Sequence, residues 1–386
     1  MSYVSHILMT ELTADERGRY ARHLILPDVG IEGQQKLKDA SVCVIGAGGL
    51  GSPALLYLAA AGIGRVGIVD DDLVDITNLQ RQIIHSNTAI GEAKAESAAR
   101  RISELNPEIT VDIHNCRLGI ENALEILADY DVIVDGVDNI PTRYIISDAC
   151  EILGKPWVYG SIFRFEGQIS LFNFEGGPNY RDLFPDPPPP ESVPSCAEAG
   201  VLGVLPGVIG SIQATEALKV VLGIGETLSG RLLIYDAKYL DFKTLRVGDL
   251  PPREKVTELV QLETYCEAKP TTDSVSEDGL GSIRADEFVS RVENGWQPYL
   301  LDVRGAMEAE IVSLPNTDVR IDLISLIDRL GEIPQDQDIV IYCRTGVRSM
   351  TAAHAINNAG FNQAILNLTG GIHAWSDLVD SSVPKY

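Results

Sequence analysis

The chain has 386 residues and a formal net charge of −24, from 31 Lys and Arg against 55 Asp and Glu. This length accommodates two domains, each with a core of its own. The negative charge argues against nucleic acid as a partner, because phosphate contacts need clustered cations. Apolar stretches are short, whereas a membrane-spanning helix needs about 20 apolar residues. With no signal-peptide pattern at the N-terminus, we expect a cytoplasmic protein that does not span or bind a membrane.

The cysteines are scattered along the chain. None of them forms a C-x-x-C pair, so in a cytoplasmic chain they predict no disulfide framework. Cys43 falls in an expected strand and Cys150 in an expected helix, so both should pack in the core. The six positions are Cys43, Cys116, Cys150, Cys196, Cys266 and Cys343.

Residues 41–250 alternate between strand and helix patterns, which predicts a mostly parallel sheet with helices on both faces. We expect strands at Ser41–Ile45, Arg65–Val69, Thr110–His114, Asp131–Val134 and Gln168–Phe174. We expect helices at Leu50–Ala61, Glu92–Leu105, Pro141–Leu153 and Val201–Leu222. The stretch Gly176–Gly200 is rich in Pro and Gly, so we expect a loop without regular structure there.

The composition changes again near residue 250. We assign residues 1–250 to a first α/β domain, 251–280 to a linker and 281–386 to a second, smaller α/β domain. In this second domain the runs Leu300–Val303 and Ile339–Tyr342 are predicted to be strands.

One cysteine has a setting that suits catalysis. Cys343 follows a strand and opens a tight loop formed by Arg344, Thr345, Gly346, Val347 and Arg348. Backbone N–H groups of such a loop, at the start of a helix, can stabilise a thiolate or a persulfide anion. Arg344 and Arg348 are expected to add fixed positive charge at the rim. The alternative is a buried cysteine at a strand end with no chemical role.

The C-terminal domain, about residues 280–386, resembles the rhodanese family. The loop is one residue shorter between Cys343 and Arg348 than the phosphate cradle of cysteine phosphatases. The run Leu300–Arg304 with Glu308, and the run Thr369–Trp375, also match. The resemblance implies that Cys343 accepts sulfane sulfur and passes it on as a persulfide. A cysteine desulfurase or thiosulfate would be the donor.

A glycine-rich motif stands near the N-terminus. Gly46, Gly48 and Gly51 form the G-x-G-x-x-G pattern after a strand, and Asp70 follows at the end of the next strand. This pattern brings phosphates to a helix N-terminus and a carboxylate to ribose hydroxyls. It fits an NAD-dependent oxidoreductase fused to a rhodanese equally well, and that function remains the alternative.

Three further charged residues favour adenylyl transfer instead. Arg81 and Lys94 can neutralise a triphosphate as pyrophosphate leaves, and Asp138 can hold Mg²⁺. In the alternative interpretation, the two cations are ordinary solvated surface charges.

Residues 11–245 resemble the ubiquitin-activating-like adenylyltransferases of the ThiF/MoeB type, which serve molybdopterin synthase and thiamine biosynthesis. The resemblance implies a Rossmann-like, doubly wound α/β domain followed by the smaller α/β rhodanese domain. It is carried by Arg19–Arg22, Gly46–Gly51, Asn78–Gln82, Asp138-Asn139 and Ser195–Gly203.

This resemblance implies that ATP and Mg²⁺ activate the C-terminal carboxylate of a small ubiquitin-like sulfur carrier ending in Gly-Gly. Sulfur from Cys343 then converts the activated carrier to a thiocarboxylate. Arg22 would reach the ATP site of a second subunit, which implies a homodimer. A scaffold that only docks carriers is a non-enzymatic alternative. The residues that would bind ATP are Gly46, Gly48, Gly49, Gly51, Asp70, Asp72, Thr77, Asn78, Leu79, Gln80, Arg81, Lys94, Asp138 and Asn139.

Two features of the family need separate treatment. Cys196 matches a cysteine that forms a transient bond to the carrier in some relatives, so we list it as a catalytic candidate. Many relatives also bind structural zinc through two C-x-x-C pairs, which would fall at 179–182 and near 248–254. Neither stretch contains cysteine, and a tetrahedral thiolate site needs four such ligands, so we expect no zinc.

Overall fold

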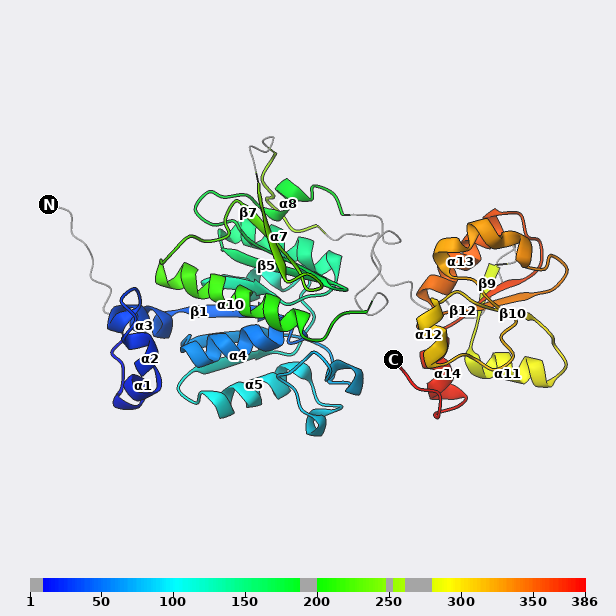
Figure 1. Cartoon of the computed structure of the whole chain (residues 1–386), viewed down its shortest axis with the longest axis horizontal. Coiled ribbons are helices and arrows are strands. Elements are labelled where there is room, and N and C mark those ends of the chain that lie inside the picture. Colours follow the sequence, from blue (N-terminus) through cyan, green and yellow to red (C-terminus); the bar gives the residue numbers. More distant parts are fainter. Residues whose placement is uncertain (1–9, 188–199, 248–252, 261–279) are drawn as a thin grey trace. The chain divides into compact units, whose positions relative to one another are not determined.

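The computed structural model describes residues 10–187, 200–247, 253–260 and 280–386. It divides into two compact units, Met1–Tyr265 and Cys266–Tyr386 (Figure 1). The boundary falls inside the stretch 251–280 that we interpret as a linker, and most of that stretch lies outside the described residues.

The described part of the N-terminal unit is built on one sheet with the strand order β3-β2-β1-β4-β5-β6-β7-β8. The first five strands in this order run parallel, and β5 to β8 continue as an antiparallel meander. β1, β2 and β4 are almost fully buried apolar runs, as parallel strands covered on both faces should be. The strands are β1 Ser41–Ile45, β2 Arg65–Val69, β3 Thr110–His114, β4 Val132–Asp135, β5 Trp157–Phe163, β6 Glu166–Phe172, β7 Arg231–Asp236 and β8 Asp241–Arg246.

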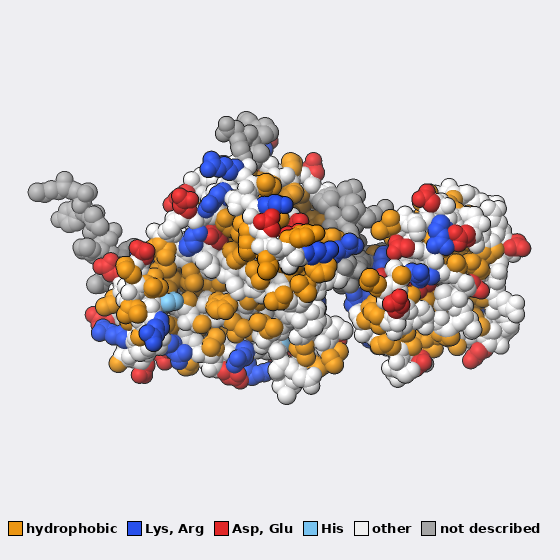
Figure 2. Space-filling model, in the orientation of Figure 1, with side chains coloured by type: hydrophobic (Ala, Val, Ile, Leu, Met, Phe, Trp, Pro, Cys, Tyr) orange, Lys and Arg blue, Asp and Glu red, His pale blue; other side chains and the backbone are white. Residues whose placement is uncertain are grey.

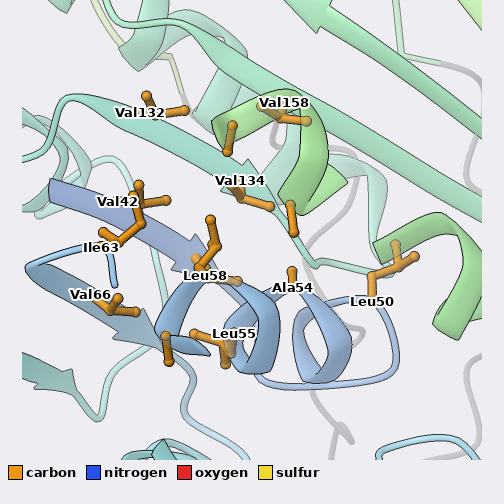
Figure 3. Close-up of a cluster of buried hydrophobic side chains, with 14 of the residues drawn as sticks. Val42, Leu50, Ala54, Leu55, Leu58, Ile63, Val66, Val132, Val134 and Val158 are labelled. Atoms are coloured by element: carbon orange, nitrogen blue, oxygen red, sulfur yellow. The ribbon is translucent and has the colours of Figure 1, made fainter. Parts of the chain in front are cut away.

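Helices cover both faces of this sheet. α4 (Gly51–Ala61), α5 (Lys94–Leu105) and α10 (Leu205–Leu222) share one apolar cluster with the sheet, whereas α6 (Ala123–Ala128) and α7 (Ile140–Leu153) share the other. Figure 3 shows Leu55 and Leu58 of α4 lying over Val42 and Val66 of the sheet. The predicted doubly wound α/β fold is therefore confirmed.

Shorter helices surround this core. Thr13 caps α1 by accepting a hydrogen bond from the backbone of Glu16, whose side chain bonds back to Thr13. These elements are α1 Ala14–Arg19, α2 Ala21–Leu24, α3 Gly30–Asp39, α8 Tyr180–Leu183, and the 3₁₀ turns η1 Ile76–Asn78 and η2 Asn87–Ala89.

Two predictions about local structure were wrong. The loop expected at Gly176–Gly200 contains α8, because Asn179 and Asp182 form a capping box that starts a helical turn. The helix expected from Val201 starts only at Leu205, because Val201 pairs with Arg164 in an isolated bridge and Leu202 N–H donates to the Arg164 carbonyl.

α10 is long and apolar enough to cross a membrane by length and composition, but half of it is buried inside the protein. It packs against α4, β5 and β6. A Cβ added at Gly210 would collide with the Leu50 carbonyl, so α10 and α4 approach closely at that point. These contacts are those of a core helix.

In the described C-terminal unit, all strands of the sheet run parallel in the order β11-β10-β12-β13-β9. Two apolar clusters pack on its opposite faces. The strands are β9 Leu280–Ile283, β10 Tyr299–Asp302, β11 Val319–Arg320, β12 Ile339–Tyr342 and β13 Ile365–Leu368. The helices are α11 Ala285–Glu293, α12 Ala306–Ile311, α13 Val347–Asn358 and α14 Gly371–Leu378, with 3₁₀ turns η5 Leu323–Ser325 and η6 Ile327–Glu332.

Charged groups are spread over the surface. Figure 2 shows Lys and Arg side chains interspersed with Asp and Glu on the face in view, rather than gathered into one basic area. The basic surface that nucleic acid needs is not formed on this face.

The stretches 179–182 and 253–254, where thiolate pairs would fall in zinc-binding relatives, are joined by ion pairs. Arg253 Nε lies 2.8 Å from Asp182 Oδ1, and Arg253 Nη2 lies 2.8 Å from Glu151 Oε2. The Glu151 side chain is only 8% exposed. Removing one partner of such a pair leaves a poorly solvated charge behind.

We therefore predict that Arg253→Ala lowers the free energy of unfolding of the N-terminal unit by about 2 kcal/mol. Urea unfolding of the full chain with Trp296 and Trp375 replaced by Phe, so that Trp157 alone reports by fluorescence, measures this change. Lys243→Ala is the control, because Lys243 pairs only with the exposed Asp241 and should cost almost nothing. Equal losses from the two variants would show that Arg253 does not fasten this segment.

Candidate functional site

The glycine-rich loop after β1 is shaped by the backbone of its neighbours. Gly46 has φ +92°, which only glycine adopts without strain, and its N–H donates to the Val69 carbonyl at 2.7 Å. A Cβ added at Gly51 would overlap the Gly46 carbonyl oxygen. The loop stands where the strand order reverses, since the connections of β1 and β4 leave on opposite sides. This is the position at which doubly wound sheets bind ligands.

A side chain at Gly48 or Gly49 would meet less steric conflict with the surrounding protein than one at Gly46 or Gly51. A Cβ at Gly48 would lie 3.6 Å from Gln82 Nε2, and one at Gly49 would lie 3.3 Å from Pro206. The carboxamide oxygen Oε1 of Gln82, a buried residue, has no hydrogen-bond partner among the residues that the structure describes. An open backbone beside an unpaired buried acceptor fits a polar ligand that brings its own donors. Gln82 was not among the predicted site residues, although it closes the quoted run Asn78–Gln82.

Acidic residues and a lysine form the second side of the site. Asp70 Oδ2 accepts from Ala47 N–H at 2.7 Å, and its Oδ1 accepts from Asp72 N–H at 2.9 Å. Burial raises the pKa of Asp70, and the nearby charge of Lys94 counteracts part of this rise. Asp70 therefore holds the glycine-rich loop in place, while its remaining lone pairs are available to a ligand.

Lys94 is not a solvated surface charge. It begins α5, its side chain is 8% exposed, and its Nζ lies 2.7 Å from Asp72 Oδ2, a carboxylate that is 68% exposed. A cation held this way, at a helix N-terminus and beside the glycine-rich loop, is positioned for an anionic ligand.

The segment 77–81 lies beside the glycine-rich loop, since a Cβ added at Gly49 would lie 3.7 Å from Arg81 Cγ. Arg81 Nη1 donates to the Thr77 carbonyl at 3.0 Å, which folds the arginine back over its own turn. A Cβ at Gly203 would collide with Gln80, so the residues that lead into α10 cover this segment. The structure therefore brings Thr77, Asn78, Leu79, Gln80 and Arg81 to the side of the glycine-rich loop.

The residues after β4 differ in whether they are open to a ligand or hold the backbone. Asp138 is exposed, whereas the Asn139 carboxamide accepts from Thr142 N–H at 3.0 Å and so caps α7. Buried Asp135 pairs with Arg143 at 3.2 Å and anchors this turn. Among the residues the structure describes, no group of three His, Cys, Asp or Glu side chains could hold a metal. Asp138 can therefore meet Mg²⁺ here only together with ligand oxygens.

His85 was given no role by the sequence, yet it supports the loop from below. Its Nε2 lies 3.0 Å from the Ala47 carbonyl and its Nδ1 lies 3.0 Å from Ser97 Oγ. Burial lowers the pKa of His85, so it remains neutral and donates from Nε2. No pattern in the sequence reveals this contact.

Arg22 does not join its own site. It is exposed on α2, one turn after Arg19, whose Nη1 donates to the Leu105 carbonyl at the C-terminal end of α5. Lys94 begins the same helix, and its 12 residues span about 18 Å. Cys196 lies outside the described residues, so the structure gives no position for it.

Cys343 lies at the carboxyl end of β12, fully buried. Its Sγ accepts from Gly346 N–H at 3.1 Å and from Ser349 Oγ at 3.3 Å. Gly346 has φ +94° and caps α13, so the loop turns back over the sulfur. Thr345 and Val347 are exposed beside it. Ser349 was not predicted to contact the sulfur.

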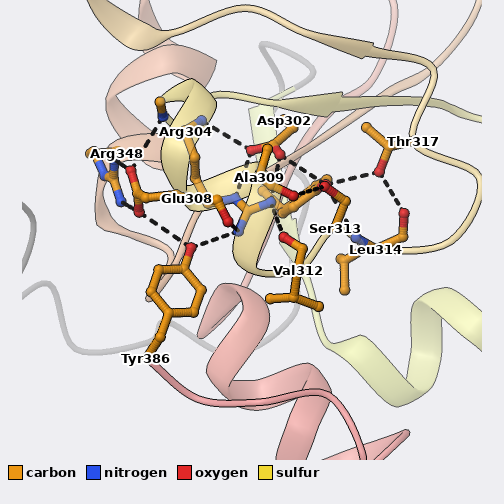
Figure 4. Close-up of polar contacts among 12 residues, drawn as sticks. Asp302, Arg304, Glu308, Ala309, Val312, Ser313, Leu314, Thr317, Arg348 and Tyr386 are labelled. Carbon is orange, nitrogen blue, oxygen red and sulfur yellow. Dashed lines mark hydrogen bonds and ion pairs between the residues drawn. The ribbon is translucent and has the colours of Figure 1, made fainter. Parts of the chain in front are cut away.

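The arginines of this loop are paired rather than free. Arg348 Nη1 and Nη2 each lie 2.7 Å from a carboxylate oxygen of Glu308 (Figure 4). Burial raises the pKa of Glu308, but the hydrogen bonds and charge of Arg348 outweigh it and hold that pKa below its ordinary value. Arg344 Nε donates to His373 Nε2 at 3.2 Å. The expected fixed charge of Arg348 is thus neutralised locally.

Both units match families of known proteins. The model of the ThiF family matches residues 20–256, and that of the rhodanese-like domain matches residues 284–378. The probable adenylyltransferase/sulfurtransferase MoeZ of Mycobacterium tuberculosis is 47% identical over 97% of this chain and 96% of its own length. Adenylyltransferase and sulfurtransferase MOCS3 of Drosophila yakuba is 42% identical over 98% of this chain and 86% of its own.

A solved structure shares the fold. Escherichia coli MccB, in a crystal structure with MccA-N7isoASN, aligns with a TM-score of 0.55 and 20% identity over 62% of this chain and 74% of that one.

The fold and the two sites define an enzyme that couples nucleotidyl transfer to sulfur transfer. The chain belongs to the ThiF family, in the two-domain form that carries a C-terminal rhodanese-like domain. It is an adenylyltransferase and sulfurtransferase. The oxidoreductase alternative is not favoured.

The steric difference between the loop glycines predicts two outcomes for stability. Gly51→Ala should lower the thermal unfolding midpoint by several degrees, since its Cβ overlaps backbone and costs about 2 kcal/mol or more. Gly48→Ala should leave the midpoint within about 2 °C of the parent. Differential scanning calorimetry of the full chain compares them. A larger loss for Gly48→Ala would mean that packing, and not a ligand, requires glycine there.

Proposed function

We propose that the N-terminal unit uses ATP and Mg²⁺ to adenylylate the C-terminal glycine of a small ubiquitin-like sulfur carrier, and that Cys343 supplies sulfur to make a thiocarboxylate. The pathway class is the synthesis of molybdopterin or another sulfur-containing cofactor. One observation carries this proposal: buried Lys94 is linked through Asp72 and Asp70 to the glycine-rich loop, in the same chain as a cradled Cys343.

In the first reaction, a carboxylate oxygen of the carrier attacks the α-phosphorus of ATP. The bond from that phosphorus to the bridging oxygen breaks, and pyrophosphate leaves with the electron pair. Lys94 and Arg81 would stabilise the charge that accumulates on the leaving phosphates. Asp138 would hold Mg²⁺, which supplies further neutralisation of the triphosphate.

The remaining predicted residues would bind the nucleotide. Gly46 would form the turn that brings the backbone N–H groups of Gly48, Gly49 and Gly51 toward phosphate, and Asp70 would accept from ribose hydroxyls. Asp72 would orient Lys94 through their ion pair. The unpaired Gln82 oxygen would accept a hydrogen bond from the ligand. The nucleotide site would also be lined by Thr77, Asn78, Leu79, Gln80 and Asn139.

In the second reaction, Cys343 first carries a persulfide. Its terminal sulfur attacks the acyl carbon of the carrier adenylate, and AMP leaves. The resulting acyl disulfide needs a thiol to cleave the sulfur–sulfur bond, which releases the thiocarboxylate. Cys196 is our candidate for that thiol, and a dithiol reductant would then reduce the disulfide left between Cys196 and Cys343.

Several further features belong to this proposal. Arg22 lies far from Lys94 of its own chain, which supports a homodimer in which Arg22 reaches the nucleotide site of the partner subunit. The sulfur donor is a cysteine desulfurase or thiosulfate, and the enzyme works in the cytoplasm. Arg253 forms ion pairs where many relatives would bind zinc, which supports a chain that needs no zinc.

Two single substitutions should separate the half-reactions in the full chain. Lys94→Met should lower carrier-dependent ATP–pyrophosphate exchange by about 100-fold, the usual cost of one electrostatic contact to a reacting phosphate. It should still form a Cys343 persulfide from thiosulfate, as seen by mass after alkylation. Cys343→Ser should keep exchange and lose the persulfide.

Lys155→Met is the matched control, because Lys155 bonds the Ala128 carbonyl at the opposite edge of the sheet. It should keep both reactions. If the parent shows no exchange with a Gly-Gly-ended carrier but binds NADH tightly, the proposal fails. If Cys343 is never labelled while carriers still bind, a docking scaffold replaces it.

A further inference from the structure

Tyr386 lies at the centre of the polar contacts around the persulfide loop. Its hydroxyl accepts from Arg304 Nη1 at 2.6 Å and donates to Glu308 Oε1 at 3.2 Å (Figure 4). Its ring lies under the Arg344 guanidinium, 5.4 Å from centroid to Cζ. Tyr386 also packs against the apolar cluster that contains Tyr342 and Trp375. One side chain therefore contacts the connection after β10, helix α12 and the loop that carries Cys343.

Arg304 shows why the hydroxyl matters. Its side chain is fully buried, so each of its five donors needs a partner. Asp302 accepts from Nε and Nη2 at 2.9 and 2.6 Å, and the Val312 carbonyl accepts from Nη2 at 2.9 Å. Among the described residues, Nη1 has only the Glu308 carbonyl at 3.4 Å and the Tyr386 hydroxyl. Tyr386 thus supplies the strongest contact of the remaining group.

The Tyr386 hydroxyl also contacts the ion pair that holds the Cys343 loop. Burial raises the pKa of Tyr386 to about 12, so its proton remains available to Glu308. Glu308 holds Arg348 with both oxygens. Arg348 is followed by Ser349, whose Oγ donates to Cys343 Sγ. The contacts therefore run unbroken from the buried Asp302–Arg304 pair to the start of the helix that holds the sulfur.

The ring acts on a different group. Arg344 follows Cys343 directly, and its guanidinium is held between His373 Nε2 and the Tyr386 ring. Burial and the charge of Arg344 lower the pKa of His373, so the imidazole stays neutral and can accept from Arg344. A cation over an aromatic face keeps its charge while it loses freedom to move. Arg344 is thereby fixed where an anionic sulfur compound approaches Cys343.

We propose that Tyr386 is a positioning residue for sulfur transfer: its hydroxyl sets the Glu308–Arg348 pair and with it the Cys343 loop, and its ring sets Arg344. This inference rests on the proposed role of Cys343 and extends it to a side chain more than 40 residues away in sequence. The hydroxyl should govern the rate of the transfer step, and the ring should govern affinity for the anion.

Sulfur transfer from thiosulfate to cyanide by the full chain tests these two roles. The Cys343 thiolate attacks the outer sulfur of thiosulfate, the sulfur–sulfur bond breaks and sulfite leaves; cyanide then removes that sulfur as thiocyanate and restores the thiolate. Rates are expressed per Cys343 that forms a persulfide, counted by mass. A purely structural role would change that count and not the rate per site.

Tyr386→Phe should lower kcat about tenfold, as expected for one lost hydrogen bond to a charged group, and leave KM for thiosulfate unchanged. Tyr386→Ala should lower kcat similarly and also raise KM about fivefold, because Arg344 loses its support. Tyr386→Phe combined with Glu308→Gln should be no slower than Glu308→Gln alone, since both act through one contact.

Tyr299→Phe is the matched control, because its hydroxyl bonds the Glu332 carbonyl at the other end of β10. It should behave as the parent. A kcat for Tyr386→Phe within about twofold of the parent, with Cys343→Ala inactive, overturns the inference and leaves the proposed function intact. Fully additive losses in the double variant overturn the route through Glu308. A parent chain that forms no Cys343 persulfide overturns the proposed function itself.

Discussion

Parallel strands end at the same edge of a sheet, and both units of this enzyme depend on that geometric constraint. Every loop that leaves such an edge carries backbone N–H groups that the sheet does not use. In the N-terminal unit those groups belong to the glycine-rich loop after β1, and in the C-terminal unit to the loop after β12. Each sheet thus collects donors for an anion at one edge. The first set suits phosphate and the second suits sulfur.

The two loops reach this result with different resources. The glycine-rich loop needs tight backbone contacts, as Gly51 against Gly46 shows, and an acid, Asp70, that ties it to the next strand. The sulfur loop needs only Gly346 and Ser349 as direct donors. Two arginines beside it are paired with acids, Arg304 with Asp302 and Arg348 with Glu308. The attraction within each pair offsets part of the desolvation penalty of burying its charges.

Much of this architecture was predictable because it depends on local patterns. The apolar runs of β1, β2 and β12 were located within a residue, since buried parallel strands read as continuous apolar segments. Cys43 and Cys150 are fully buried, as their positions in a strand and a helix predicted. The helix start at Leu205 was missed because the pairing of Val201 with Arg164 is a tertiary contact. β8 was missed because it is an edge strand whose residues are all exposed, and β7, which pairs with it, was missed too.

The site was predictable in its motifs and not in its supports. Lys94 was singled out by type and position, but its burial against Asp72 could be established only from the coordinates. His85 contacts Ala47 and Tyr386 contacts Arg304, which are distant in sequence, and Ser349 contacts Cys343 across the loop. Gln82 lies beside Gly48, which is also distant in sequence. A single sequence contains no record of such contacts. Residue type alone could not distinguish the paired Arg348 from a free rim charge.

The complete burial of the Cys343 sulfur has a consequence for the lifetime of the enzyme. Oxidation of a thiol to sulfenic and then sulfinic acid requires that an oxidant reach the sulfur, so its rate falls as the sulfur becomes more buried. Gly346 and Ser349 contact the sulfur directly. An idle molecule is thereby protected from irreversible loss of its working atom. Sulfur exchange requires an accessible sulfur, whereas resistance to oxidation requires a buried one. The buried resting position of Cys343 favours resistance to oxidation.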